Sequence, residues 1–397
     1  MFDSVALNAT LPLEVIRVIQ LSRQSIDEID TRYFNGLHLW VPFLCPRRFR
    51  RDLTNFQSIP TAEFSLIIFC MSLITYDPRQ YNPPPIGHDT LYFHAKTLFT
   101  QLQVSRRPSI QLIQAGILIA IYEYAHGRPD SALASIDICA RMAYKAGIHQ
   151  KPENPGWNEA WNTWWAIRIF ERVFYCETTL TDLPLISSPP AEAELLPCES
   201  RDFEGEENPI LSCQGFPVNL VGIGCFGRAA QATYLLDRVI QMIKCTEPTD
   251  LKSRIVALDQ KLLRLLATTM DRCHDHRRGH CGAVCISIRA LFILHQHVLH
   301  LNTTHIASEC RQHSQSALDT VTQMILDIAR NHHRIHGPDV DAISPVYNYI
   351  VRHTLQYLYE KRYPDSDAWF QESDTLRQSL AKLNRRWPVD PGISFEL

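Results

Sequence analysis

One block, Ser109 to Leu180, constrains the fold of this chain more than any other feature. Its apolar residues recur at spacings of three and four, which is the period of the buried face of a helix. Ser109 is a suitable N-cap for the first stretch, Gly127 and Pro129 interrupt the pattern, and Gly147 ends the second stretch. The block therefore predicts two antiparallel helices joined by a short loop, followed by a third helix.

The third helix of this block carries tryptophans at positions 157, 161, 164 and 165, four within nine residues. Side chains of this size surround much of a helix, so we expect this helix to lie at the centre of a core. An acid–arginine pair, Glu171-Arg172, follows on the same helix. Such a pair is compatible with an active site and also with a partly buried structural ion pair.

Helical patterns with short connections run through the rest of the chain, and the sequence lacks the sustained alternation that is typical of strands. Glycine is scarce, with 15 residues, which argues against a sheet with many tight turns. We therefore predict an all-α fold of packed antiparallel helix pairs, forming a single domain over residues 1–397. An irregular acidic, proline-rich crossing is expected over 183–217. Further helices are expected over 11–24, 25–46, 61–75, 90–104, 227–244, 251–273, 283–301, 307–332, 345–363 and 366–386.

The net charge of −3 provides no general basic excess for holding nucleic-acid phosphates. One local run, Arg47-Arg48-Phe49-Arg50-Arg51, is basic. A run of this kind can serve as a nuclear import signal or a phosphate contact, and it can also be a solvated helix start or loop.

The twelve cysteines form no Cys-x-x-Cys pair, and several lie in apolar stretches, as expected in a reducing compartment. The N-terminus lacks the basic and apolar regions of a secretory signal. The most apolar segment, Phe64 to Ile74, is about half the length that a membrane span requires. We therefore expect no membrane partner.

The stretch Gly222-Ile-Gly224-Cys-Phe-Gly227 matches the spacing of a dinucleotide-binding loop, in which glycines let a pyrophosphate approach a helix N-terminus. A second strand ending in an acidic residue, which would contact the ribose, is missing about twenty residues further on. The alternative interpretation is a flexible entry to a helix.

A second cluster, Cys273 to Cys285, contains metal-capable side chains that include His274, His276, His280 and Cys281. Its spacing matches no common zinc module, and Arg277-Arg278 would oppose a cation, so a polar helix connection is the alternative. His295, His297 and His300 on the next helix are expected to face solvent or satisfy a core polar group. No hydrolase elbow, Walker loop or His-Glu-x-x-His motif occurs. We therefore expect no enzyme, and assign no catalytic, cofactor-binding or metal residues.

The order of these motifs resembles the regulatory, or middle homology, domain of fungal zinc-binuclear-cluster transcription factors. Tyr33-Phe34, His38 and Pro42 resemble its early motif, and Trp164-Trp165 through Glu171-Arg172 resemble its Trp-Trp helix. Leu196-Pro197-Cys198-Glu199 and a C-terminal helix with Cys310 and Ala317 follow in the family's order.

The chain departs from that pattern at three points. Trp161-Asn162 stands where the family usually has basic residues, and Thr181-Asp182-Leu183-Pro184 stands where it has Gly-Arg-Pro. The six closely spaced cysteines of the family's zinc cluster are also missing, so the chain resembles a regulator without its usual DNA reader.

The resemblance implies a nuclear regulator of transcription in a fungal pathway, with secondary metabolism among the candidates, acting through protein or effector binding. Its implied partners are other transcription regulators or the transcription machinery. The resemblance also implies a dimer, either with a second copy of the chain or with a relative. Specific DNA binding by this chain alone is not expected. One alternative is a truncated gene model of a full zinc-cluster protein. Another is a helical enzyme or nucleotide binder that uses Gly222, Gly224 and Gly227.

Overall fold

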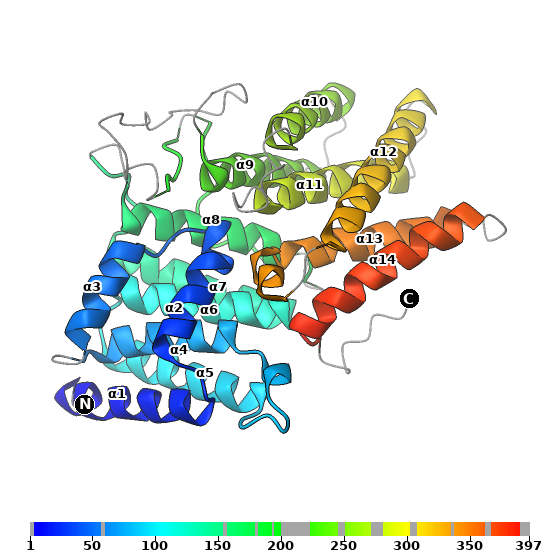
Figure 1. Ribbon diagram of the computed structural model, residues 1–397. Coiled ribbons are helices and arrows are strands. Elements are labelled where there is room, and N and C mark those ends of the chain that lie inside the picture. Colours follow the sequence, from blue (N-terminus) through cyan, green and yellow to red (C-terminus); the bar gives the residue numbers. More distant parts are fainter. Residues whose placement is uncertain are drawn as a thin grey trace, which may run out of the picture. The chain divides into compact units, whose positions relative to one another are not determined.

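The computed structural model describes residues 4–56, 60–153, 157–178, 182–192, 194–199, 223–244, 251–270, 281–301, 308–334, 337–361 and 367–389. The regular elements within these ranges are all helices, which confirms the all-α prediction (Figure 1). The chain divides into two compact units, Met1–Ser188 with Pro197–Ser212, and Pro189–Leu196 with Cys213–Leu397. The single domain expected over 1–397 stays a prediction.

The first unit contains eight of the described α-helices, joined by short connections. They are α1 (Ser4–Leu21), α2 (Ile26–Asn35), α3 (Pro46–Phe56), α4 (Ala62–Thr75), α5 (His88–Ser105), α6 (Ile110–Ala125), α7 (Pro129–Ala146) and α8 (Glu159–Tyr175). Two short 3-10 turns, η1 (Leu37–Leu39) and η2 (Pro78–Gln80), lie between them.

Local signals set the ends of these helices. The Ser109 hydroxyl accepts a hydrogen bond from the backbone N of Leu112 at 3.2 Å, as a helix N-cap does. Gly147 ends α7 in the left-handed region, with φ at 76°, where a side chain would be strained. Thr61 caps α4 in the same manner as Ser109. The helix boundaries predicted over residues 109–147 are therefore confirmed.

The core of the first unit is built around helices that are buried on all sides. In α4, every residue from Phe64 to Thr75 is buried, and the same holds for Leu112 to Ala125 in α6. Helix α6 packs against α4, α5, α7 and α8, so it is the central helix of this unit (Figure 1). Apolar residues all around such a helix are typical of a core position.

The second unit contains the remaining described helices. These are α9 (Cys225–Lys244), α10 (Leu251–Met270), α11 (Cys281–His300), α12 (Ser308–His332), α13 (Val346–Lys361) and α14 (Asp367–Arg386), with a 3-10 turn, η5, over Gly337–Ala342. Helix α11 packs against α9, α10, α12 and α13 of the same unit. Its segment Gly282–His300 is long and apolar enough to cross a membrane, but 78% of that segment is buried within the protein. We therefore interpret α11 as a core helix.

Two expected helices differ from the structure. The helix expected over 11–24 is α1, which begins earlier, at Ser4, and ends at Leu21. The pattern over 25–46 extends past the end of α2 at Asn35, because Gly36 and the η1 turn redirect the chain before Pro46. The basic run begins a separate helix, α3, in which Pro46 occupies the first helical position, where its missing N–H costs nothing. Of the crossing expected over 183–217, residues 183–192 and 194–199 contain no helix, and the remainder lies outside the described residues.

Candidate functional site

Helix α8 carries the polar groups of the candidate site. It begins at Asn158, whose side chain accepts a hydrogen bond from the backbone N of Trp161 at 3.0 Å. Every residue from Trp161 to Tyr175 is buried, which confirms that the tryptophan helix is central to its core. Because the whole surface of α8 is covered, each of its polar side chains needs a partner within the protein.

Arg168 lies between two tryptophans of the same helix. Its guanidinium carbon lies 5.4 Å from the ring centroid of Trp164 and 4.8 Å from that of Trp165. The side chain is 2% exposed. Aromatic faces attract a cation more strongly when water is excluded, so the two rings hold this guanidinium in one place.

Glu171 and Arg172 form an ion pair in which both side chains are fully buried. Arg172 Nη1 donates to Glu171 Oε2 at 2.8 Å. The pair predicted from sequence is therefore a structural ion pair, and its burial is complete rather than partial. A charged pair of this kind is tolerated in a core only when its other polar atoms are also hydrogen-bonded.

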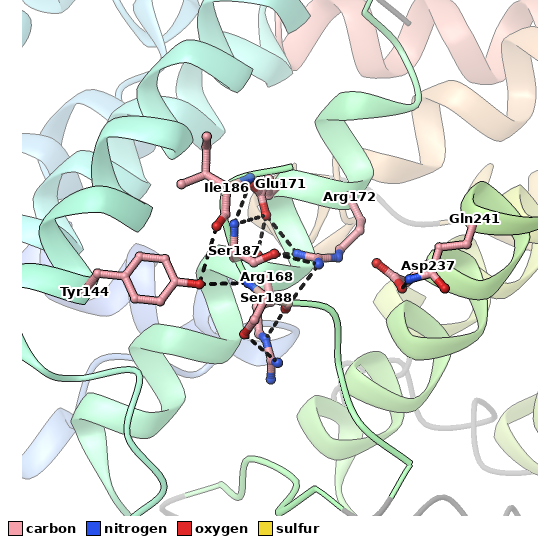
Figure 2. A network of polar contacts seen from close by, with 9 residues as sticks. All are labelled: Tyr144, Arg168, Glu171, Arg172, Ile186, Ser187, Ser188, Asp237 and Gln241. Carbon is pink, nitrogen blue, oxygen red and sulfur yellow. Dashed lines mark hydrogen bonds and ion pairs between the residues drawn. The ribbon is translucent and has the colours of Figure 1, made fainter. Parts of the chain in front are cut away.

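Those further bonds go to a short non-helical stretch, Ile186, Ser187 and Ser188, which we name the captured segment (Figure 2). Glu171 accepts from the backbone N atoms of Ile186 and Ser187 and from the Ser187 hydroxyl. Arg172 donates to the Ser187 hydroxyl and to the carbonyl oxygens of Ser187 and Ser188, the latter two at 3.1 and 3.2 Å. Arg168 Nε donates to the Ser188 carbonyl at 3.1 Å.

Helix α7 supplies one more contact to the captured segment. The Tyr144 hydroxyl accepts from the backbone N of Ser188 at 2.9 Å and lies 3.4 Å from the Ile186 carbonyl. Side chains thus satisfy the backbone of three consecutive residues, as a neighbouring strand would in a sheet. The site binds a peptide backbone by means of two helices.

A second carboxyl, Asp137 of α7, lies in the field of Glu171. Burial and the negative charge of Glu171 raise the pKa of Asp137 to about 7, although Arg141 acts in the opposite direction. Its Oδ1 atom is buried, and among the described residues no hydrogen-bond partner reaches it. The environment of Glu171 therefore disfavours a second negative charge near neutral pH.

Asn162, one of the departures from the family pattern, links α8 to two chain segments. Its Nδ2 donates to the carbonyl of Pro42 at 3.3 Å and to that of Cys198 at 2.7 Å. Pro42 belongs to the early motif and Cys198 to the Leu-Pro motif, so this amide connects both to the tryptophan helix. Sequence reasoning missed this role, because it treated Asn162 only as a missing basic residue.

The early motif packs as an aromatic cluster. The ring of Phe34 lies 5.1 Å from that of Tyr33, 4.8 Å from that of His38 and 5.6 Å from that of Phe49. Trp40 contacts Phe170 of α8 edge-to-face at 5.7 Å. The motif therefore serves packing of α2, α3 and α8 rather than exposed chemistry.

The basic run forms the exposed side of α3. Its four arginines line that side and Phe49 between them is buried. Arg48 pairs with Glu159 at 2.8 Å, and Arg50 pairs with Asp30 at 3.3 Å. The run is thus a solvated helix start, and its use as an import signal or phosphate contact stays a prediction.

The two other sequence motifs only partly fall on described residues. Gly224 precedes α9 and Gly227 lies in its first turn, while Gly222 lies outside the described residues. Within the described ranges no strand leads into this turn. The cluster from Cys273 to His280 also lies outside them, and among the described residues no group of three metal-capable side chains converges.

His295 of α11 satisfies a core polar group. Its Nε2 lies 3.1 Å from Asp259 Oδ1, and its Nδ1 lies 3.1 Å from the hydroxyl of Ser314. The exposed His313 reaches the other oxygen of Asp259 at 3.0 Å. Burial alone would raise the pKa of Asp259, but the hydrogen bonds from the two histidines outweigh it and hold that pKa below its usual value. A single carboxylate thus ties α10 to α11 and α12.

The chemistry of the α8 site is that of binding. Ser187 is 2% exposed, and its hydroxyl is held between Glu171 and Arg172, so it is not available to a substrate. The Glu171 carboxylate and the Arg172 guanidinium are engaged by each other and by the captured segment. This arrangement holds a chain segment in place on the tryptophan helix, and it keeps the ion pair away from solvent.

Comparisons with known proteins agree with the resemblance. Residues 31–177 match the family described as the fungal specific transcription factor domain. A relative from Botryotinia fuckeliana (strain B05.10), Transcription factor BOA15, is 26% identical over 141 residues, which cover 35% of this chain and 77% of that protein. No solved structure gives a significant match. The matched range runs from α2 to the end of α8, and it contains the early motif and the Glu171-Arg172 pair. Residues 31–177 of this chain are therefore similar to the fungal specific transcription factor domain.

Proposed function

We propose that this protein regulates transcription through contacts made by its helical scaffold, and that it does not read DNA with a zinc cluster inside these 397 residues. The observation that carries the proposal is the family match over 31–177, which coincides with one continuous series of packed helices in the first unit. The sequence contributes no Cys-x-x-Cys pair and no basic excess to a DNA interface.

The relevant partners are other transcription regulators or the transcription machinery in the nucleus, and the genes concerned belong to a metabolic pathway by the family resemblance. Support for a binding mechanism comes from the site itself. The buried Glu171-Arg172 ion pair holds a backbone segment by hydrogen bonds. A buried network whose polar groups are all hydrogen-bonded supplies rigidity rather than reactivity.

A tethering assay tests the proposal. The full chain, fused to an unrelated DNA-binding domain, is recruited to a reporter gene in fungal cells. Reporter output should rise or fall at least several-fold relative to the DNA-binding domain alone. Unchanged output from a fusion that is folded, nuclear and bound at the reporter would contradict the proposal.

DNA binding is tested separately with the purified chain. We expect only weak, salt-sensitive retention of DNA, because no built DNA-reading module is present in the sequence. Sequence-selective binding that persists as salt is raised would show that this chain reads DNA itself.

A further inference from the structure

The captured segment ends on a Ser-Pro dipeptide, Ser188-Pro189. The sequence contains one other Ser-Pro dipeptide, Ser344-Pro345, and no Thr-Pro dipeptide. Ser344 is fully buried, and its hydroxyl accepts from the backbone N of Val346 at 3.3 Å. Ser188 is exposed. The fold therefore presents one of two equivalent motifs to solvent and encloses the other.

We propose that Ser188 is a phosphorylation site for a proline-directed protein kinase, and that Arg168 binds the phosphate it receives. In the transfer, Ser188 Oγ attacks the γ-phosphorus of MgATP and an Oγ–P bond forms. The bond from that phosphorus to the bridging oxygen of ADP breaks, and the hydroxyl proton passes to the catalytic aspartate of the kinase. This modification is independent of the proposed role in transcription.

The position of Arg168 supplies the phosphate site. Its Nη2 already lies 3.4 Å from Ser188 Oγ, and its Nε donates to the Ser188 carbonyl at 3.1 Å. Arg168 is 2% exposed, and its guanidinium lies against the rings of Trp164 and Trp165. A phosphoserine carries about −1.5 to −2 charges at pH 7 and three acceptor oxygens. Charge-assisted hydrogen bonds to a fixed, mostly dehydrated guanidinium are the strong kind.

The neighbouring hydroxyl shows why the site is specific. Ser187 is also a serine of the captured segment, but its hydroxyl donates to Glu171 and is buried. A phosphate there would meet a carboxylate in a place without water, and it would break the bonds that hold the segment. Phosphorylation at Ser188 thus tightens the captured segment on α8, whereas phosphorylation at Ser187 would release it.

The experiment uses the full purified chain, a proline-directed kinase and MgATP, with the phosphorylated residues located by mass spectrometry. We expect phosphate on Ser188 and none on Ser344 in the folded protein. Amide hydrogen exchange over Ile186–Ser188 should slow at least several-fold after phosphorylation. Absence of phosphate on Ser188, when the kinase modifies a peptide spanning residues 183–193, would overturn the proposal, and so would faster exchange in the phosphorylated protein.

Two control variants separate the effect of the phosphate itself from the effect of its binding to Arg168. Ser188→Ala should take no phosphate and leave exchange unchanged. Arg168→Lys should be phosphorylated but lose most of the slowing, since lysine cannot present the planar fork. Because replacing a buried arginine can unfold the domain, a ³¹P NMR titration of the unsubstituted protein gives a second measure. Binding to a guanidinium should lower the second pKa of the phosphate below its usual value of about 6. An unshifted phosphate pKa would refute the role of Arg168.

Discussion

Replacing Glu171 by Gln tests the captured segment most sharply, because it removes one buried charge and keeps the shape of the side chain. The carboxylate accepts from Arg172 Nη1, from the backbone N atoms of Ile186 and Ser187, and from the Ser187 hydroxyl. A carboxamide has one accepting oxygen, and its NH2 group would face donors. Glu171→Gln therefore leaves some of these donors without an acceptor.

The expected loss follows from those contacts. A hydrogen bond to a charged group contributes about 1.5–3 kcal/mol, and breaking a buried ion pair costs about 3–5 kcal/mol. Since these terms overlap, we expect the unfolding free energy of the first unit to fall by about 3–5 kcal/mol. For a unit of about 200 residues this corresponds to a decrease in Tm of roughly 6–20 °C.

Urea unfolding followed by tryptophan fluorescence measures this loss, since four of the seven tryptophans lie within residues 157–165. Glu14→Gln is the matched control. Glu14 lies in the same unit, its side chain is 49% exposed, and its contact with His94 is 3.9 Å long. This substitution should change the unfolding free energy by less than about 0.5 kcal/mol. A Glu171→Gln loss below about 1 kcal/mol would refute the reasoning.

Three further substitutions follow from the structure. Asp137→Asn should raise the unfolding free energy more at pH 8 than at pH 5. The difference between the two pH values should be on the order of 1 kcal/mol after allowance for partial exposure. The reason is that the folded pKa of Asp137, about 7, lies above the ordinary value of 3.8, so the unsubstituted protein loses stability as the pH rises from about 4 to about 7. Equal effects of the substitution at both pH values would contradict this reasoning. Asp259→Asn should lower the unfolding free energy by about 1.5–3 kcal/mol at neutral pH. This loss should shrink only as the pH falls below about 4, because the hydrogen bond from His295 helps keep the pKa of folded Asp259 below its usual value. Denaturant titrations from pH 3 to 7 check this, and a cost that is constant down to pH 3 would count against it. Gly116→Ala should lower the unfolding free energy by about 1–3 kcal/mol, since the new Cβ would lie 2.5 Å from Cys139 Sγ. If the variant were as stable as the parent in urea unfolding, α6 and α7 could separate without a loss of stability.

The helices themselves were predictable because their signals are local. The predicted starts and ends in 227–244, 251–273, 283–301, 307–332, 345–363 and 366–386 agree with α9 to α14 within about three residues at each end. The period of the apolar residues, the capping residues and the positions of prolines all depend on residues close together in the sequence. These helices could therefore be predicted without tertiary information. The boundary at Asn35 was harder, since apolar residues continue past it and serve the η1 turn.

The polar network could be predicted only in part. Glu171-Arg172 was recognisable as a pair, but its complete burial depends on residues 186–188, which bind it from outside the helix. No periodicity links Asn162 to Pro42, because the two are 120 positions apart and meet only through the packing of α8. Likewise, nothing in the spacing of Ser188 and Arg168 indicates that they touch. Contacts of this kind follow from the fold, and a single sequence does not specify them.

The most direct test of the central claim, that this scaffold acts on transcription, is nascent RNA sequencing after rapid depletion of the protein in its native host. We predict that synthesis of a small, coherent set of transcripts changes within minutes, before any metabolite changes. If metabolites shift first while nascent transcription stays constant, the protein is not a transcription regulator, and the central claim is wrong.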